Sequence, residues 1–228
     1  MRPAQESRPS PPADATDHPK AFRSRWAVIV FLLTAVAGLA GDLISKEYVF
    51  DSLLGERADL AEDVRTVSQR LSAPLGPPPA SREVLRHLNV RRPLALGVEL
   101  TLSTNPGVVF GMPMQRAAVV VATLVTVAIV GFFFATSSAR QRWLHAALGL
   151  VLAGALGNLY DRLFAAVTLP GIEPIRRQVR DFLDFSAWHY PWVFNIADAL
   201  LVVGVAIIIL HGLVNWRRAA DAPPKAKG

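Results

Sequence analysis

Four long apolar runs, separated by polar stretches, dominate the pattern of the chain. They extend over residues 26–44, 117–135, 143–160 and 192–213. A helix that crosses a bilayer needs about 20 apolar residues at a rise of about 1.5 Å each, so every run is long enough or nearly so. Tryptophans near the run ends are typical of the membrane–water interface: Trp26, Trp143, Trp192 and Trp216. The pattern predicts a mainly α-helical membrane protein built on a bundle of four transmembrane helices.

The segments around these runs divide the chain into one membrane domain and two tails. Residues 1–25 are rich in proline and polar residues and predict a disordered cytoplasmic tail. Residues 214–228 are expected to form a second cytoplasmic tail, and its last ten residues have a similar composition. The four-span domain occupies residues 26–213 and carries two longer loops, over residues 47–115 and 162–191.

The first longer loop carries elements of its own. Residues 53–71 repeat apolar positions with helical periodicity, and residues 93–109 alternate in part, as a strand does. We therefore expect a short helix followed by a small extracytoplasmic β-rich subdomain on the outer membrane face.

Composition agrees with this class. Apolar residues make up 52% of the chain and charged residues 18%, a balance typical of an integral membrane protein. The net charge of +6 comes largely from basic residues beside the runs, so it does not indicate a nucleic-acid partner. The chain has no cysteine, and its five histidines show no pair at ligand spacing, so we expect no disulfide, metal or cofactor.

Lysine and arginine next to the runs predict the orientation. Basic residues precede the first run, separate the second from the third, and follow the fourth: Lys20, Arg23, Arg25, Arg140, Arg142, Arg217, Arg218, Lys225 and Lys227. In a four-span protein these regions share one side, which we expect to be cytoplasmic and to hold both termini. Arg176, Arg177 and Arg180 in an outer loop oppose this assignment.

A cleavable leader is the alternative interpretation of the first run. Gly38-Leu39-Ala40 resembles a small-x-small cleavage site. The preceding 25 residues, however, contain acids such as Glu6 and Asp14, which favours an uncleaved anchor.

The most informative residue is an acid inside the last run. Asp198 follows Asn195 by three residues, which would place both on one helical face. A carboxylate at the centre of a membrane helix costs about 2.5–3.5 kcal/mol, and such residues usually face a protein interior or a wet cavity. Asp198 is therefore a candidate functional group.

Other polar residues lie near the outer ends of the runs. Asp42 and Lys46 have the i, i+4 spacing of a helical ion pair, which could also be a pair at the membrane interface. Asn105 and Gly107 flank a proline, a sequence that by itself indicates a turn. A further group repeats the Asn/Asp spacing, with either a structural or a functional role: Asn158, Asp161 and Arg162.

Two neighbouring carboxylates offer a specific chemistry. Both cannot ionise easily, so they share a proton. One can then act as a base that activates water while the other donates to a carbonyl, which hydrolyses a peptide bond without a metal. The residues alone leave Asp161, Asp181 and Asp184 open as the partner of Asp198.

Five clusters in order resemble the lipoprotein signal peptidases, the bacterial membrane aspartic peptidases also called signal peptidase II. The family blocks are D-x-x-S-K, N-x-G-A-A-F, G-G-A-x-G-N-x-x-D-R, V-V-D-F and F-N-x-A-D. The chain reads D-L-I-S-K from Asp42, N-P-G-V-V-F from Asn105, G-A-L-G-N-L-Y-D-R from Gly154, V-R-D-F from Val179 and F-N-I-A-D from Phe194. Each block alone is weak, and the five together on four spans are specific.

The resemblance implies a role for each matched residue. Asp181 and Asp198 would form the catalytic dyad. The remaining matches would bind substrate or shape the site: Asp42, Lys46, Asn105, Gly107, Asn158, Asp161, Arg162 and Asn195. Departures from the pattern include Val108 and Val109 in place of two alanines and Thr104 in place of an arginine, and both outer loops are longer than usual.

The family implies an endopeptidase of the bacterial inner membrane with its site at the periplasmic face. Its substrate would be a prolipoprotein whose lipobox cysteine carries diacylglycerol. We expect a monomer that contacts membrane lipids. A small transporter or channel subunit with a proton relay through Asp198 and Asp161 is the alternative, but it predicts acids spread across the bilayer depth and internal repeats. A structural membrane protein would leave the Asn/Asp pairs unexplained.

Overall fold

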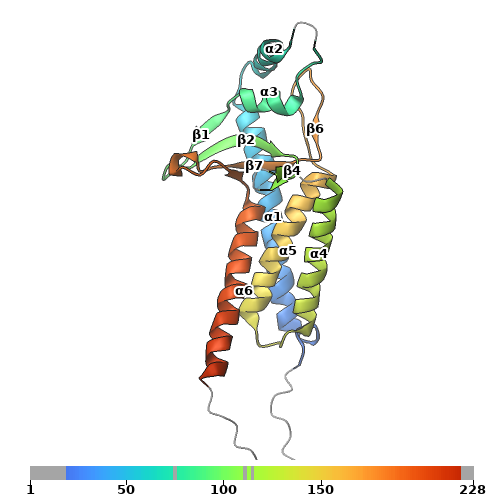
Figure 1. The fold of residues 1–228 in the computed structure, drawn as a ribbon, viewed down its shortest axis with the longest axis vertical. Coiled ribbons are helices and arrows are strands. Elements are labelled where there is room, and N and C mark those ends of the chain that lie inside the picture. Colours follow the sequence, from blue (N-terminus) through green and yellow to red (C-terminus); the bar gives the residue numbers. More distant parts are fainter. Residues whose placement is uncertain (1–18, 74–75, 110–111, 114–115, 222–228) are drawn as a thin grey trace, which may run out of the picture.

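The computed structural model describes residues 19–73, 76–109, 112–113 and 116–221. Four helices in it have the length and apolar composition of membrane spans, and they stand side by side in Figure 1. They are α1 (Arg25–Gly55), α4 (Arg116–Thr136), α5 (Arg142–Leu163) and α6 (Ile196–Ala220). The predicted four-helix bundle with a small β-rich region is therefore confirmed.

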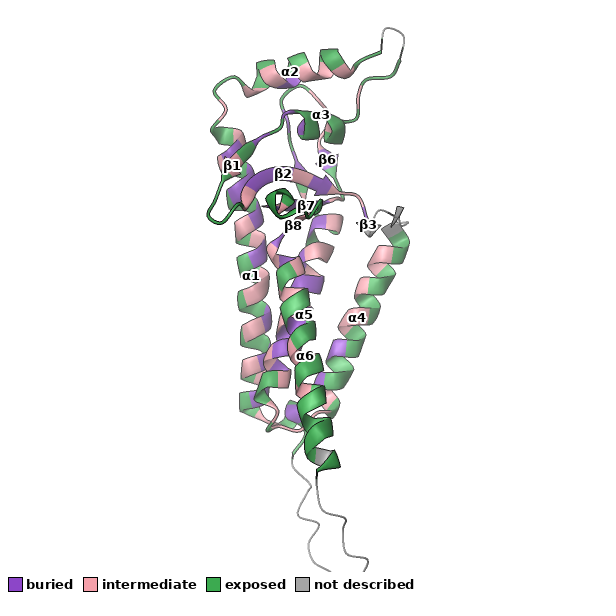
Figure 2. Cartoon of the chain, turned by 60° about the vertical axis from the view of Figure 1, so that its left-hand side comes forward, coloured by how far each residue is buried: buried purple, intermediate pink, exposed green. Residues whose placement is uncertain are grey.

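Helix α5 is the centre of the bundle. It packs closely against both α1 and α6 and has ten buried residues, and Figure 2 shows buried segments between the helices of the bundle. Small residues permit this approach, because a Cβ added at Gly149 would meet Thr34 of α1 and one added at Gly154 would meet the carbonyl oxygen of Ala197 in α6. Close helix approach through small residues is a usual packing mode in membranes.

Helix α4 joins the bundle at the end where α5 begins. Phe134 of α4 stacks on Phe31 of α1, with ring centroids 4.3 Å apart, and its edge contacts His145 of α5. A 3₁₀ helix, η1 (Ala21–Arg23), packs beside α4 and α1, and Lys20 forms an isolated bridge with Ser138. The expectation of disorder is therefore wrong for residues 20–25, while residues 1–18 lie outside the described part.

The other end of the bundle carries the β-rich region (Figure 1). A four-stranded antiparallel sheet has the order β1 (Arg91–Pro93), β2 (Glu99–Asn105), β7 (Val179–Asp184) and β8 (Val193–Phe194). Two small hairpins flank it: β3 (Val108–Val109) with β4 (Met112–Pro113), and β5 (Ala166–Val167) with β6 (Ile175–Arg176). A 3₁₀ helix, η2 (Ser186–Trp188), follows β7.

Two helices cover this sheet on the side away from the bundle. They are α2 (Leu60–Leu71) and α3 (Ser81–His87). Their apolar faces share one core with the end of α1 and the sheet, through residues such as Leu53, Val64, Leu85 and Phe182. The sheet is thus fixed between this cap and the membrane helices.

Three predicted boundaries need correction. The helix expected over residues 53–71 is two helices, because α1 runs on to Gly55 and α2 starts only at Leu60. The last helix begins at Ile196 rather than near residue 192, because the residues before it pair with β7 as strand β8. That helix also continues to Ala220, beyond the predicted start of the tail at residue 214, and residues 222–228 lie outside the described part.

Candidate active site

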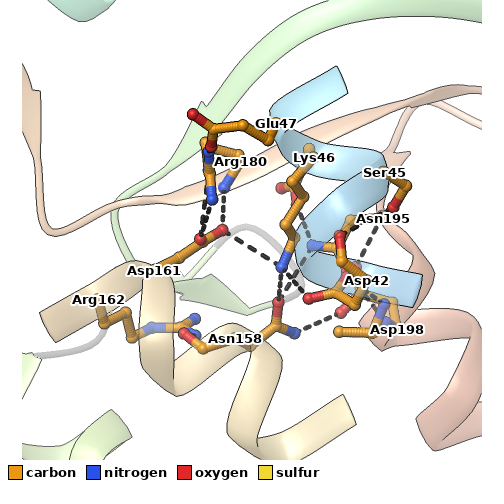
Figure 3. A network of polar contacts seen from close by, with 12 residues as sticks. Asp42, Ser45, Lys46, Glu47, Asn158, Asp161, Arg162, Arg180, Asn195 and Asp198 are labelled. Atoms are coloured by element: carbon orange, nitrogen blue, oxygen red, sulfur yellow. Dashed lines mark hydrogen bonds and ion pairs between the residues drawn. The ribbon is translucent and has the colours of Figure 1, made fainter. Parts of the chain in front are cut away.

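Lys46 of α1 is the centre of a buried polar network (Figure 3). Its Nζ lies 2.7 Å from Asp42 Oδ2 and 3.2 Å from Asp161 Oδ2, and it donates to Asn158 Oδ1 at 3.2 Å. Lys46, Asp42 and Asp161 are all fully buried. Buried charges are stable only when they are paired and hydrogen-bonded, which this arrangement achieves. The predicted Asp42–Lys46 ion pair is confirmed.

Asp42 also binds the start of α6. Its Oδ1 accepts a hydrogen bond of 2.8 Å from the backbone N–H of Ala197, one of the amides that a helix leaves unpaired at its N-terminus. Gly157 of α5 provides the space, because a Cβ at that position would clash with Asp42 Oδ2. One carboxylate therefore connects α1 with α6 across a glycine of α5.

Asn195 caps α6 and is not part of a helical face, which corrects the expectation from spacing. Its Oδ1 accepts from the backbone N–H of Asp198 at 3.1 Å, and Asp198 Oδ2 accepts from the backbone N–H of Asn195 at 3.3 Å. This reciprocal capping box fixes the side chain of Asp198 at the first turn of α6.

Two side-chain amides connect Asp198 with Asp181 of β7. Asn195 Nδ2 donates to Asp181 Oδ1 at 2.6 Å and to Asn158 Oδ1 at 3.1 Å. Asn158 Nδ2 in turn donates to Asp198 Oδ1 at 2.8 Å. The two carboxylates are thus held by neighbouring amides, while Asn158 also accepts from Lys46.

The environment of Asp181 favours its protonated form. Burial, reinforced by the carboxylate of Asp198, raises the pKa of Asp181 to about 8, against the opposing effects of the Asn195 amide and of the charges on Lys46 and Arg162. A carboxyl group with such a pKa holds a proton at neutral pH and can donate a hydrogen bond.

Asp198 is half-buried and opens onto a groove of about 250 Å³. The groove is largely apolar and is lined by Leu183, Phe185, Phe194, Asn195, Asp198, Ala199, Val202 and Val203. Val202 and Val203 are exposed on the side of α6, so the groove leads from the membrane-facing surface of this helix to a carboxylate.

The other predicted site residues lie around this network. Arg162 donates from Nη1 to the backbone oxygen of Asn158 at 2.9 Å. Asn105 ends β2 opposite Val179 of β7, and its Oδ1 accepts from the backbone N–H of Gly107 at 2.9 Å. Gly107 has φ of 112°, a conformation that favours glycine. The predicted turn is therefore present, beside the strand that carries Asp181.

The three acids considered as partners of Asp198 have different surroundings. Asp161 is occupied by Lys46 and Arg180. Asp184 pairs with Arg91 at 2.9 Å and accepts from the backbone N–H of Ser186 at 2.7 Å. Asp181 is the one that Asn195 connects with Asp198, because its side-chain amide donates to Asp181 and its backbone N–H donates to Asp198.

Sequence reasoning missed two members of the network, Arg180 and Glu47. Arg180 bonds to Asp161 and to Glu47 Oε2, at 3.0 Å and 2.6 Å. The available signal was a basic residue beside Asp181 in the segment V-R-D-F-L-D. Within the described ranges, no three His, Cys, Asp or Glu side chains converge in a way that could hold a metal ion.

Several lipoprotein signal peptidases are similar in sequence to part of this chain. A lipoprotein signal peptidase of Desulfitobacterium hafniense is 38% identical over 120 residues, which cover 52% of this chain and 71% of that protein. One from an Anaeromyxobacter species is 36% identical over 131 residues, or 57% of its length. One from Yersinia pestis is 41% identical over 81 residues, which cover 35% of this chain and 41% of that protein.

Solved structures have a similar fold, and a family model gives the same assignment as these relatives. A bacterial membrane enzyme solved by the in meso method at 2.3 Å has a TM-score of 0.57 and 19% identity, covering 92% of this chain and 99% of that one. A second, solved at 1.9 Å, has a TM-score of 0.53 and 21% identity, covering 80% and 92%. These two similarities concern the fold alone.

The family model described as signal peptidase (SPase) II matches residues 34–214, so the chain belongs to the signal peptidase II family and is a membrane peptidase.

Proposed function

We propose that this protein is an aspartic endopeptidase that removes the signal peptide from diacylglyceryl-modified bacterial prolipoproteins. Asp181 and Asp198 would be its catalytic dyad. The observation that carries the proposal is the junction at Asn195, whose side chain donates to Asp181 while its backbone donates to Asp198. One residue thereby orients two carboxyl groups, and one of them, Asp198, lines an apolar groove.

The surroundings of the two acids suggest how they divide the work. Asp181 holds the proton at neutral pH and donates to the scissile carbonyl oxygen. Asp198 is oriented by Asn158 and the Asn195 backbone and accepts a proton from water, whose oxygen forms the new bond to the carbonyl carbon. The tetrahedral intermediate collapses when Asp198 passes the proton from water to the amide nitrogen and the carbon–nitrogen bond breaks, without an acyl-enzyme. Asp181 takes back a proton from a hydroxyl group of the intermediate as the carbonyl forms again.

The groove beside Asp198 suits a substrate that stays partly in the membrane. Phe185 and Phe194 line it together with Val202 and Val203 of α6. Apolar walls leave a signal helix or acyl chain in contact with nonpolar surface while the scissile bond reaches the carboxyl groups.

We place the protein in the bacterial inner membrane as a monomer, with its site at the periplasmic face. The basic residues support this orientation, because Lys20 precedes η1, Arg142 starts α5 and Arg217 lies in the last turn of α6. These helix ends lie away from the β-rich region (Figure 1). Arg180, which opposed the orientation in the sequence, is neutralised by Asp161 and Glu47.

The test is cleavage of a diacylglyceryl-modified prolipoprotein by the purified protein in detergent, followed as a gel shift. The parent should cleave, while Asp181→Asn and Asp198→Asn should lose turnover and still insert. Asp184→Asn is the matched control, because Asp184 lies on the same strand but is paired with Arg91. This variant should retain most of the activity. Equal turnover of the parent and the Asp198→Asn variant would refute the proposed dyad.

The proton-relay alternative has less support. A relay needs acids distributed through the bilayer depth. Among the described residues of the spans, Asp42, Asp161 and Asp198 instead belong to one connected network at the end of the bundle next to the sheet.

A further inference from the structure

Arg180 occupies an unusual position beside the proposed dyad. It precedes Asp181 in β7, and successive side chains of a strand point to opposite faces. The contacts agree with this geometry, because Asp181 reaches Asn195. Arg180 instead reaches Asp161 of α5, as Figure 3 shows. Because the two residues are neighbours in β7, the contacts that fix Arg180 also fix the backbone next to Asp181.

Asp161 binds both the backbone and the side chain of Arg180. Its Oδ2 accepts from the Arg180 backbone N–H at 2.9 Å, and its Oδ1 accepts from Nε at 3.2 Å and Nη2 at 3.0 Å. The Arg180 side chain is only 6% exposed. The planar guanidinium suits such paired contacts with a carboxylate, and a compact ammonium does not reproduce them.

Glu47 binds the remaining end of the same guanidinium. Its Oε2 accepts from Arg180 Nη1 at 2.6 Å, while the Glu47 side chain is 66% exposed. Glu47 directly follows Lys46, which contacts Asp161 from the other side. Arg180 therefore joins α5 and α1 to β7, and its charge is balanced by one buried and one exposed carboxylate.

We propose that Arg180, clamped between Asp161 and Glu47, is a positioning residue that holds Asp181 against the Asn195 amide. This inference rests on the proposed function, since it assumes that Asp181 reacts. The family block V-V-D-F has valine at this place, and a valine could form none of the three side-chain bonds. The clamp is thus a feature that the resemblance does not supply.

Loss of the clamp should affect the chemical step more than substrate binding. The groove beside Asp198 contains neither Arg180 nor Glu47, so binding surfaces stay in place. Displacement of a reacting group by about 1 Å can reduce turnover by about 100-fold. We expect Arg180→Met to lower kcat by about 10- to 100-fold with KM changed less than about threefold.

Two further variants separate positioning from a general structural role. Arg180→Lys keeps the charge but loses the planar group that makes the paired contacts with Asp161. Its kcat should therefore lie between those of Arg180→Met and the parent. Glu47→Gln keeps an oxygen acceptor at an exposed site, so kcat should fall less than about threefold. The matched control is Arg92→Met, because Arg92 also pairs with a glutamate of the first-helix region, Glu56, at 2.5 Å but away from the dyad.

The experiment measures kcat, KM and the unfolding temperature of these variants beside Asp181→Asn, on the lipid-modified prolipoprotein. A reduced kcat in Arg180→Lys at an unchanged unfolding temperature supports the clamp. A parent-like kcat in Arg180→Lys, or a rise in its KM alone, overturns the clamp. If Arg180→Met fails to accumulate, the result for Arg180→Lys decides the test. If Asp181→Asn loses turnover while the Arg180 variants match the parent, the clamp fails and the proposed dyad stands. If Asp181→Asn remains active, the proposed function fails as well.

Discussion

Two Asn-x-x-Asp segments in this protein have the same spacing and opposite surroundings. The first ends α5 with Asn158 and Asp161, and the second starts α6 with Asn195 and Asp198. Asp161 is fully buried between the cations Lys46 and Arg180. Asp198 is half-buried, faces an apolar groove and accepts from an amide and a backbone N–H.

The difference teaches that spacing alone does not determine the role of a carboxylate. A carboxylate held by two buried cations is fixed by charge and contributes to the fold. One that is oriented by neutral donors and reachable from a groove remains able to exchange a proton. We therefore propose a structural role for Asp161 and a chemical role for Asp198, and the following variants test this contrast.

The largest effect on activity should come from Asp198→Asn. General acid–base groups contribute about 10²- to 10⁴-fold to rate, so turnover should fall by that amount. Asparagine keeps one acceptor oxygen for two donors, Asn158 Nδ2 and the Asn195 backbone N–H, so the loss of stability should be limited to one hydrogen bond, about 1–3 kcal/mol. Cleavage rates and thermal unfolding in one preparation check both statements, and a large loss of stability would contradict the assigned role.

The largest effect on stability should come from Asp161→Asn. It leaves Lys46 and Arg180 buried with one charged partner fewer, which costs about 3–5 kcal/mol in the free energy of unfolding. The control is Asp63→Asn, whose pair with Arg57 is partly exposed and contributes about 1 kcal/mol or less. Equal unfolding midpoints in denaturant for these two variants would remove the contrast.

A smaller effect should follow from Gly157→Ala in α5. The added methyl group would clash with Asp42 Oδ2 and disturb the contact with Ala197, so we expect a loss of about 1–3 kcal/mol. Gly41→Ala is the matched control, because a Cβ there meets no described atom within 4 Å. Thermal unfolding should separate the two variants, and equal midpoints would mean that the helices approach less closely.

A further prediction concerns the dependence of stability on pH. The pKa of Asp181 is raised to about 8 from an ordinary value of 3.8, so its proton stabilises the folded form fully below about pH 4. This contribution is lost as pH rises through about 8. Unfolding temperatures from pH 4 to 9 should therefore fall less in Asp181→Asn than in the parent, and superimposable curves would contradict the raised pKa.

The sequence predicted those features that depend on local periodicity. The four spans and the Asp42–Lys46 pair follow from apolar length and from the i, i+4 spacing, and the structure confirms both. The prediction that Asn195 lies on a helical face was wrong. The two residues before it pair with β7 as strand β8, so α6 starts only after Asn195, which becomes its N-cap.

Long-range contacts could not be read from the sequence. Arg180 meets Asp161 across 19 positions and Glu47 across 133, and neither separation leaves a local pattern. The partner of Asp198 among three acids likewise depends on where β7 lies relative to α6, and Asp181 remains a proposal that the contacts of Asn195 support.

The most direct test of the dyad compares Asp181→Asn, Asp198→Asn and the double variant in single-turnover cleavage of a lipid-modified prolipoprotein. Groups that act as a unit show strongly non-additive losses. We predict that either single variant loses about as much activity as the double variant, because the proton is exchanged between both carboxyl groups. Losses that multiply in the double variant, or a single variant with parent-like cleavage, would contradict a shared function of Asp181 and Asp198.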